Sequence, residues 1–260
     1  PAHVSTAGDL NLARFCESVE SGHTDQEEAA RTLQRYNLLA VPVVDQEGRL
    51  EGVTTADDLI DVLQEEATED MYRMIGLDEE ESASTPIRQT IRLRLPWLLV
   101  NLVTAFAGAF VVSLFDSTLE KAVVLAAFMP VVANQSGVTG TQTATIMVRS
   151  LALGERRTSL QRVLMREVFI GFANGVVIGA VLALVALLFT GNTTLALILL
   201  GSMAAASTLA TIIGQMVPLA LRAVGADPAL ASSIFVTMFT DALSFLFLLG
   251  TATLAVSRLQ

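Results

Sequence analysis

The sequence predicts an α-helical polytopic membrane protein with five membrane-spanning helices and a small cytoplasmic α/β module. Hydrophobic residues make up 52% of the 260 residues, more than one soluble core can bury. The charge is divided unevenly. Residues 1–85 hold 20 acidic and 5 basic side chains, net −15, whereas residues 86–260 hold 6 and 11, net +5. We therefore expect a module at 1–63, an acidic connecting segment at 64–87 and a membrane domain at 88–260.

Five apolar segments are long enough to cross a bilayer. A helix that rises 1.5 Å per residue needs roughly 20 residues to span a hydrocarbon layer about 30 Å thick. The spans are expected at residues 95–115, 122–148, 168–189, 195–221 and 229–256. The second differs from the others because its middle is polar.

The basic residues predict how these spans are oriented. Cytoplasmic connections carry an excess of Lys and Arg. Arginines precede the first span, fill the connection between the second and third, and follow the fourth, whereas the opposite connections hold only Lys121. We therefore expect the amino terminus inside and the carboxyl terminus outside, in the cell (inner) membrane, with the acidic module in the cytoplasm.

Asp241 is a carboxylate within the last apolar span and has no basic residue near it in the sequence. A charge near the bilayer centre costs about 2.5–3.5 kcal/mol on insertion scales, so such residues usually face a bundle interior or a wet cavity. This favours a cation site. The alternative is a helix enclosed in protein, with Asp241 protonated or hydrogen-bonded to Thr237 or Thr240.

The second span contains the polar run NQSGVTGTQT at residues 134–143. A backbone loosened by its two glycines is tolerated in a membrane only where protein buries it or water wets it. Amide and carbonyl oxygens also suit a hard cation that keeps its water. Together with Asp241 the run favours a pore over polar contacts between helices. We expect the pore to be lined by Asn134, Gly137, Gly140, Thr141, Gln142 and Thr237.

The module is expected to contain two strands, at residues 38–44 and 50–54, between a helix at 26–36 and another from Ala56. Its sequences AVPVVD (40–45) and GVTTADD (52–58) resemble a cystathionine-β-synthase (CBS) repeat. Such repeats normally work in pairs, and one clear copy is present here. The resemblance implies that Thr54 and Asp57 hold the ribose of an adenine nucleotide.

Acidic residues gather on the helix expected at residues 57–70. Like charges three or four residues apart on a helix are mutually destabilising. A solvated face is one explanation. The other is a set of divalent cations, because Mg²⁺ is commonly held by one or two carboxylates and several retained waters.

These features together resemble the MgtE family of magnesium channels. The most specific parts are MP at 129–130 with GTQ at 140–142, EEATED at 65–70, and DPALAS at 227–232 followed by Asp241. The resemblance implies a homodimer whose pore is formed by the second and fifth spans of both subunits, with the two Asp241 side chains binding a hydrated Mg²⁺. It also implies that cytosolic Mg²⁺ closes the pore by bridging acidic residues: Asp58, Asp61, Glu66, Glu69, Asp70 and Asp227.

Two departures from the family pattern bear on ion selectivity. The family's usual glycine-asparagine pair before the Gly-x-Gln motif is Gly137-Val138 here, and residues 233–234 are Ser-Ile where asparagine or glycine and then proline are common. Asn134, one turn before Val138, is a candidate substitute amide.

The predicted function is gated, passive Mg²⁺ uptake with feedback from cytosolic Mg²⁺. The alternatives are a Mn²⁺/Co²⁺ channel or an exporter of the same fold, or a non-conducting membrane-anchored sensor. No enzyme is expected, because both histidines, His3 and His23, lie in the poorly patterned start of the chain and no nucleophile–base pair is apparent. The expected partners are a second copy of the chain, membrane lipid and a divalent cation, with no nucleic acid.

Overall fold

The computed structural model describes residues 38–45, 47, 49–57, 68–78, 81–152, 157–230 and 232–255. The chain divides into two units, Pro1–Asp70 and Met71–Gln260, which are described separately. The predicted helix at 26–36 and most of the acidic helix at 57–70 lie outside the described residues, as do Asp58, Asp61 and Glu66.

The described part of the first unit is a two-stranded antiparallel hairpin. Strand β1 spans Ala40–Val44 and strand β2 spans Leu50–Thr55, so both predicted strands are confirmed, with ends that differ slightly from the prediction. Asp45 closes the turn by accepting hydrogen bonds from the backbone N–H groups of Glu47 (3.0 Å) and Arg49 (2.8 Å). These bonds, chiefly the one from Arg49, favour the ionised carboxylate and lower the pKa of Asp45.

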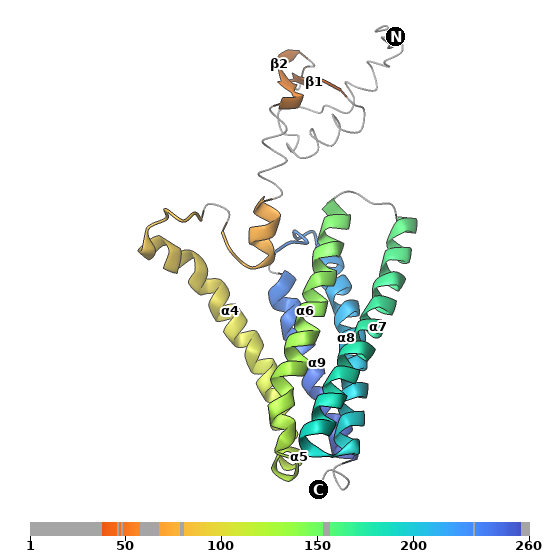
Figure 1. The fold of residues 1–260 in the computed structure, drawn as a ribbon. Helices are drawn as coiled ribbons and strands as arrows, with labels where there is room; N and C mark the ends of the chain where they lie inside the picture. Colours follow the sequence, from red (N-terminus) through yellow and green to blue (C-terminus); the bar gives the residue numbers. More distant parts are fainter. Residues whose placement is uncertain are drawn as a thin grey trace. The chain divides into compact units, whose positions relative to one another are not determined.

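The second unit is made of helices (Figure 1). Among the described residues from Glu81 onward, five helices are long and one is short: α4 (Ile87–Ser113), α5 (Asp116–Lys121), α6 (Val124–Ala152), α7 (Arg157–Thr190), α8 (Thr193–Ala223) and α9 (Ser232–Leu254). Each of the five long helices overlaps one of the five predicted spans. The short helix α5, which connects α4 to α6, was not predicted.

Four of the described helices are both long and apolar enough to cross a membrane, namely α4, α7, α8 and α9. Helix α6 is long enough as well but is less apolar, because its polar run lowers its mean hydropathy. Helices α4 and α7 begin well before the predicted spans. In both helices the apolar stretch ends where arginines begin, but the helix itself continues past them.

The polar run of α6 does not loosen the backbone, contrary to the sequence prediction. Helix α6 continues without a break through Gly137 and Gly140. Its hydroxyl groups are satisfied within the helix, because each donates a hydrogen bond to the carbonyl four residues earlier. The donors are Ser136, Thr139, Thr141, Thr143 and Thr145.

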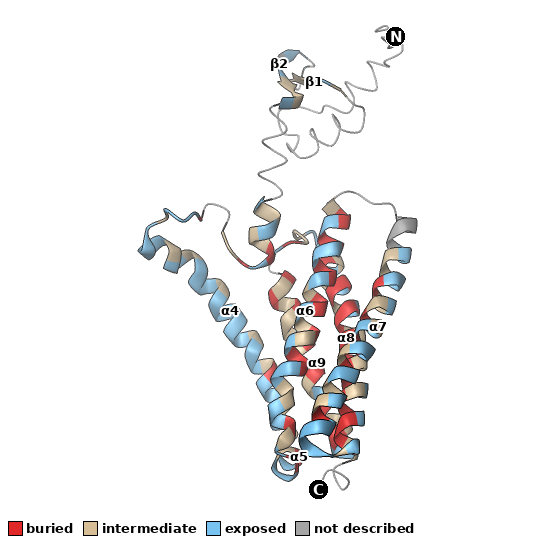
Figure 2. Ribbon diagram, viewed as in Figure 1, coloured by how far each residue is buried: buried red, intermediate tan, exposed pale blue. Residues whose placement is uncertain are grey.

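Helix α8 is the centre of the bundle and packs against α6, α7 and α9. Gly171, Gly175 and Gly179 of α7 lie against α8, so closely that a Cβ atom on Gly175 would lie 2.9 Å from the Cα of Ala204. This glycine stripe therefore serves close helix packing. Apolar residues of α6, α8 and α9, such as Leu125, Leu199 and Leu248, form the buried core (Figure 2).

Helix α4 packs chiefly on α9, and most of its surface is exposed (Figure 2). Its contact with α9 is centred on the buried Gly108, where a Cβ atom would lie 3.4 Å from the ring of Phe245 and 3.9 Å from the Cβ of Asp241. Large apolar side chains such as Val103, Phe106 and Phe110 are at least 65% exposed. In a chain with several membrane spans, this face suits acyl chains or another protein helix.

Candidate functional site

The candidate site lies where α6 and α9 run side by side in opposite directions. Gly140 allows the two helices to approach, since a Cβ atom there would lie 2.7 Å from Cγ1 of Val236 and 3.0 Å from Cγ2 of Thr240. Nearer the start of α6, a Cβ atom on Gly137 would lie 3.8 Å from the hydroxyl oxygen of Thr240. These contacts fix the register that brings Asp241 next to the polar run of α6.

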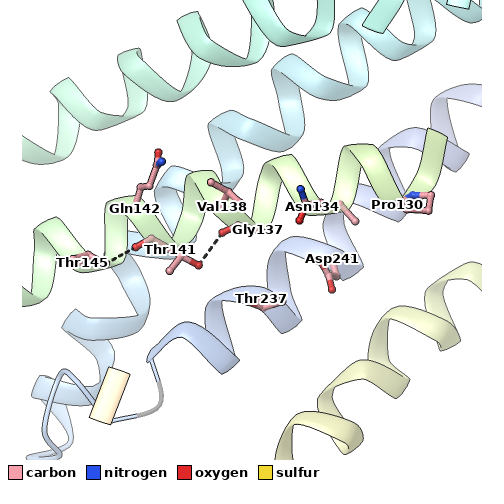
Figure 3. A pocket seen from close by; sticks show the side chains of 10 residues that line it. Pro130, Asn134, Gly137, Val138, Thr141, Gln142, Thr145, Thr237 and Asp241 are labelled. Atoms are coloured by element: carbon pink, nitrogen blue, oxygen red, sulfur yellow. Dashed lines mark hydrogen bonds between the residues drawn. The ribbon is translucent and has the colours of Figure 1, made fainter. Parts of the chain in front are cut away.

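Helices α6 and α9 line a pocket of about 590 Å³ beside this contact (Figure 3). Asp241 and Thr237 come from α9 and are one turn apart. The remaining lining residues recur at helical spacing along one face of α6: Pro130, Ala133, Asn134, Gly137, Val138, Thr141, Gln142 and Thr145. The pocket therefore brings five of the six predicted pore residues together with the predicted cation ligand.

Asp241 is the acidic residue of this pocket. It is partly buried, and no described residue donates a hydrogen bond to its carboxylate. The alternative in which Thr240 is hydrogen-bonded to Asp241 is not seen, because the Thr240 hydroxyl donates to the carbonyl of Thr237 instead (3.1 Å). The carboxylate thus has both oxygens available for a cation or for water.

The α6 wall offers further oxygen atoms. The hydroxyl of Thr141 donates to the carbonyl of Gly137 (2.9 Å), and that of Thr145 donates to the carbonyl of Thr141 (2.9 Å). A hydroxyl that donates its proton in this way keeps lone pairs to accept a hydrogen bond from water. Such a wall is therefore better suited to an ion that keeps its hydration shell than to an ion that must lose its waters.

Gly140 is the predicted pore residue that does not line the pocket. It is buried at the junction of α6, α8 and α9, and its carbonyl oxygen lies against Gly214 of α8. Because glycine has no side chain, the three helices can approach one another closely at this point. Val138 and Thr145 line the pocket although they were not predicted to do so. They follow Asn134 by four and eleven residues, a spacing that places all three on the same face of a helix.

Asp227 lies in the loop between α8 and α9 and does not join the pocket. Its carboxylate forms an ion pair with Arg73, with the Arg73 Nη1 and Asp227 Oδ2 atoms 2.8 Å apart, and accepts a hydrogen bond from the backbone N–H of Ala229 (2.8 Å). The sequence prediction missed Arg73. Nearby, the Ser233 hydroxyl donates to the carbonyl of Met74, which packs against Val148 and Ala229.

The other predicted site residues fall elsewhere. Glu69 and Asp70 are partly buried in the described helical turns before Met71, Thr54 is partly buried on β2, and Asp57 is exposed. Within the described ranges, no three His, Cys, Asp or Glu side chains gather as a metal-binding group. The predicted bridging of acidic residues by Mg²⁺ stays a prediction.

Comparison with known families identifies both parts of the chain. Residues 129–251 match the model of the MgtE family, described as a divalent cation transporter, and residues 19–65 match the CBS domain. The matched ranges contain most of α6, all of α7 and α8, and most of α9, including Asp241, together with the β1–β2 hairpin.

Three curated proteins named magnesium transporter MgtE are similar to the chain. The protein of Bacillus subtilis (strain 168) is 34% identical over 236 residues, which is 90% of this chain and 52% of the relative. Those of Enterococcus faecalis and Thermus thermophilus are also 34% identical, over 88% and 89% of this chain. The chain spans about half the length of the curated relatives it matches.

Proposed function

Because the chain belongs to the MgtE family of divalent cation transporters, we propose that it conducts Mg²⁺ across the membrane through the pocket between α6 and α9. The observation that carries this proposal is the position of Asp241, with no hydrogen-bond donor from a described residue, among hydroxyl and amide side chains. An ionised side chain in a membrane helix costs about 2.5–3.5 kcal/mol, and a bound cation offsets that cost.

The proposed ion is hydrated Mg²⁺. This ion is small, gives up its waters reluctantly and is usually held by one or two carboxylates while it keeps several waters. A wall of hydroxyl and amide groups accepts hydrogen bonds from those waters. Uptake needs no chemical energy, because a membrane potential supplies about 2.3 kcal/mol per unit charge per 100 mV, doubled for a divalent ion.

The proposed assembly is a homodimer in which both copies contribute α6 and α9 to one pore. Two Asp241 carboxylates near a symmetry axis would repel each other in a medium of low dielectric constant, and a dication between them removes that repulsion. The exposed apolar face of α4, with Phe106 and Phe110, supports a location against lipid or the second copy.

The proposed topology has five spans, with α6 included because neighbouring helices and water shield its polar run. The arginines before α4, between α6 and α7 and at the end of α8 then lie in the cytoplasm by the positive-inside rule. The amino-terminal module would be cytoplasmic and the end of α9 would face outward, in the cell membrane.

The proposed gate responds to cytosolic Mg²⁺. Residues 1–85 carry a net charge of −15. In the dimer, the two copies of this segment would repel each other when divalent ions are scarce. Mg²⁺ bound by the connecting acids and by Asp227 would favour a compact, closed state, which amounts to differential binding to two states. Uptake would then stop when internal Mg²⁺ is sufficient.

The experiment that tests conduction is ion flux into proteoliposomes that contain the chain. We expect Mg²⁺ uptake that rises with an inside-negative potential and that Mn²⁺ and Ca²⁺ inhibit only at higher concentration. Stronger flux of Mn²⁺ or Co²⁺ would favour the rival channel of the same fold, and outward transport against the potential would favour an exporter. Absence of flux of any divalent ion would favour the membrane-anchored sensor.

A further inference from the structure

The α6 wall of the pocket is layered along the helix axis. Pro130 lies at one end, Asn134 and then Val138 follow at intervals of one turn, and Thr141, Gln142 and Thr145 lie beyond them (Figure 3). Val138 is apolar and 45% exposed. It therefore separates the amide of Asn134 from the hydroxyl and amide groups of the farther layer.

Asp241 lies toward the Asn134 end of this wall. Helices α6 and α9 are antiparallel, with Gly140 against Val236 and Gly137 facing Thr240, so the residue after Thr240 lies toward the start of α6. Figure 3 shows Asn134 and Asp241 on facing helices, with Thr237 displaced toward Thr141. One amide and one carboxylate thus share a layer of the pocket.

The Asn134 side chain is exposed, and no described residue forms a hydrogen bond with its amide. Thr141 and Thr145 differ, because their hydroxyls are tied to backbone carbonyls of α6. A free amide offers an oxygen that accepts hydrogen bonds and an NH₂ group that donates them. Asn134 can therefore turn its oxygen toward water that surrounds an ion at Asp241.

We propose that Asn134 is a selectivity-determining residue, which accepts a hydrogen bond from water bound to the ion at Asp241. This inference rests on the proposed conduction of Mg²⁺ and adds the residue that discriminates between divalent ions. Mg²⁺ requires near-ideal octahedral geometry and keeps its waters, whereas Ca²⁺ takes six to eight oxygen ligands in flexible geometry. An acceptor placed one water layer from the ion therefore favours the ion that arrives hydrated.

The test compares Mg²⁺ and Ca²⁺ uptake by proteoliposomes that contain the parent chain, Asn134→Ala, Asn134→Leu or Asn101→Ala. The leucine variant keeps the branched shape and the number of side-chain heavy atoms of asparagine without its polar atoms. Asn101 is an exposed asparagine on α4 that does not line the pocket, so it controls for loss of an amide in a membrane helix. Elution as a single species and thermal unfolding establish that each protein is folded.

We expect both Asn134 variants to lower the preference for Mg²⁺ over Ca²⁺ by about tenfold, which equals about 1.4 kcal/mol. The Asn101→Ala protein should keep the parent ratio. If Asn134→Ala does not fold, Asn134→Leu carries the test, since it preserves packing. An unchanged ratio in a folded Asn134 variant, or an equal fall in the uptake of both ions, would overturn the inference and leave Mg²⁺ conduction standing. A parent chain without Mg²⁺ flux would overturn the proposed function and this inference together.

Discussion

The guanidinium of Arg73 lies 2.8 Å from the carboxylate of Asp227, at the point where the segment before α4 meets the loop before α9. Asp227 is one of the carboxylates proposed to bind cytosolic Mg²⁺, and in the structure Arg73 already supplies a positive charge beside it. Arg73 and Mg²⁺ are therefore expected to compete for this carboxylate. The adjacent hydrogen bond from Ser233 to the carbonyl of Met74 holds the same segment against α9.

Replacing Arg73 with alanine should make the protein more dependent on Mg²⁺ for stability. The ion pair is roughly one-third exposed, so its loss should lower the free energy of unfolding by about 1 kcal/mol or less. Asp227 would then lack its arginine partner, and Mg²⁺ bound there would stabilise the folded state by mass action. Thermal unfolding with and without Mg²⁺ measures the difference.

The control for this prediction is Arg222→Ala, which removes an exposed arginine at the end of α8. It lowers the positive charge equally without touching the Arg73–Asp227 pair. An Arg73→Ala protein whose stabilisation by Mg²⁺ equals that of the control would show that arginine and ion do not compete for Asp227.

Replacing Gly214 with alanine should destabilise the bundle and reduce flux. A Cβ atom there would overlap the carbonyl oxygen of Gly140 and lie 3.0 Å from Cβ of Thr143, so α6 would have to move away from α8. Overpacking of this kind costs about 1–3 kcal/mol. Thermal unfolding in detergent, together with flux in proteoliposomes, tests both effects.

Gly201→Ala is the matched control, because Gly201 is also in α8 and a Cβ atom there would meet nothing within 4 Å. It should be neutral or stabilising by up to about 1 kcal/mol, since alanine forms helices better than glycine. Equal stability of the two variants would contradict the close contact between Gly140 and Gly214.

Neutralising the connecting acids should uncouple uptake from internal Mg²⁺. In the triple variant Glu66→Gln, Glu69→Gln and Asp70→Asn, we expect flux to persist at internal Mg²⁺ concentrations that close the parent channel. With fewer carboxylates, the difference between the affinity of Mg²⁺ for the closed state and its affinity for the open state is smaller, so Mg²⁺ favours closure less. Flux recorded while internal Mg²⁺ is raised measures the closing concentration.

Glu47→Gln serves as the control for the triple variant, because Glu47 is an exposed acid in the hairpin turn. Its closing concentration should match that of the parent. Closure of the triple variant at the parent concentration would remove Glu66, Glu69 and Asp70 from the mechanism.

The long helices could be predicted from hydropathy, because a stretch of about 20 apolar residues has few other stable environments. Their ends could not. Helix α7 begins at Arg157 and α4 at Ile87, since a helix that leaves the apolar layer can continue in water. The backbone of α6 was misjudged, because its hydroxyl groups bond to carbonyls one turn earlier and are satisfied without a break in the helix.

The candidate site was predictable in part. The spacing along α6 and the isolated acid at 241 pointed to residues that the fold brings into one pocket. The burial of Gly140 against α8 and α9 depends on how three helices cross, which local sequence does not encode. The same holds for the Arg73–Asp227 pair, whose partners are far apart in the sequence.

Mg²⁺ flux into proteoliposomes, compared between the parent chain and Asp241→Ala, measures whether Asp241 binds the conducted ion. Because a hydrogen-bonded contact to a charged group contributes about 1.5–3 kcal/mol, the variant should lose at least about tenfold in Mg²⁺ flux and should discriminate less between Mg²⁺ and Ca²⁺. Unchanged flux and unchanged ion competition in a folded Asp241→Ala protein would contradict the account.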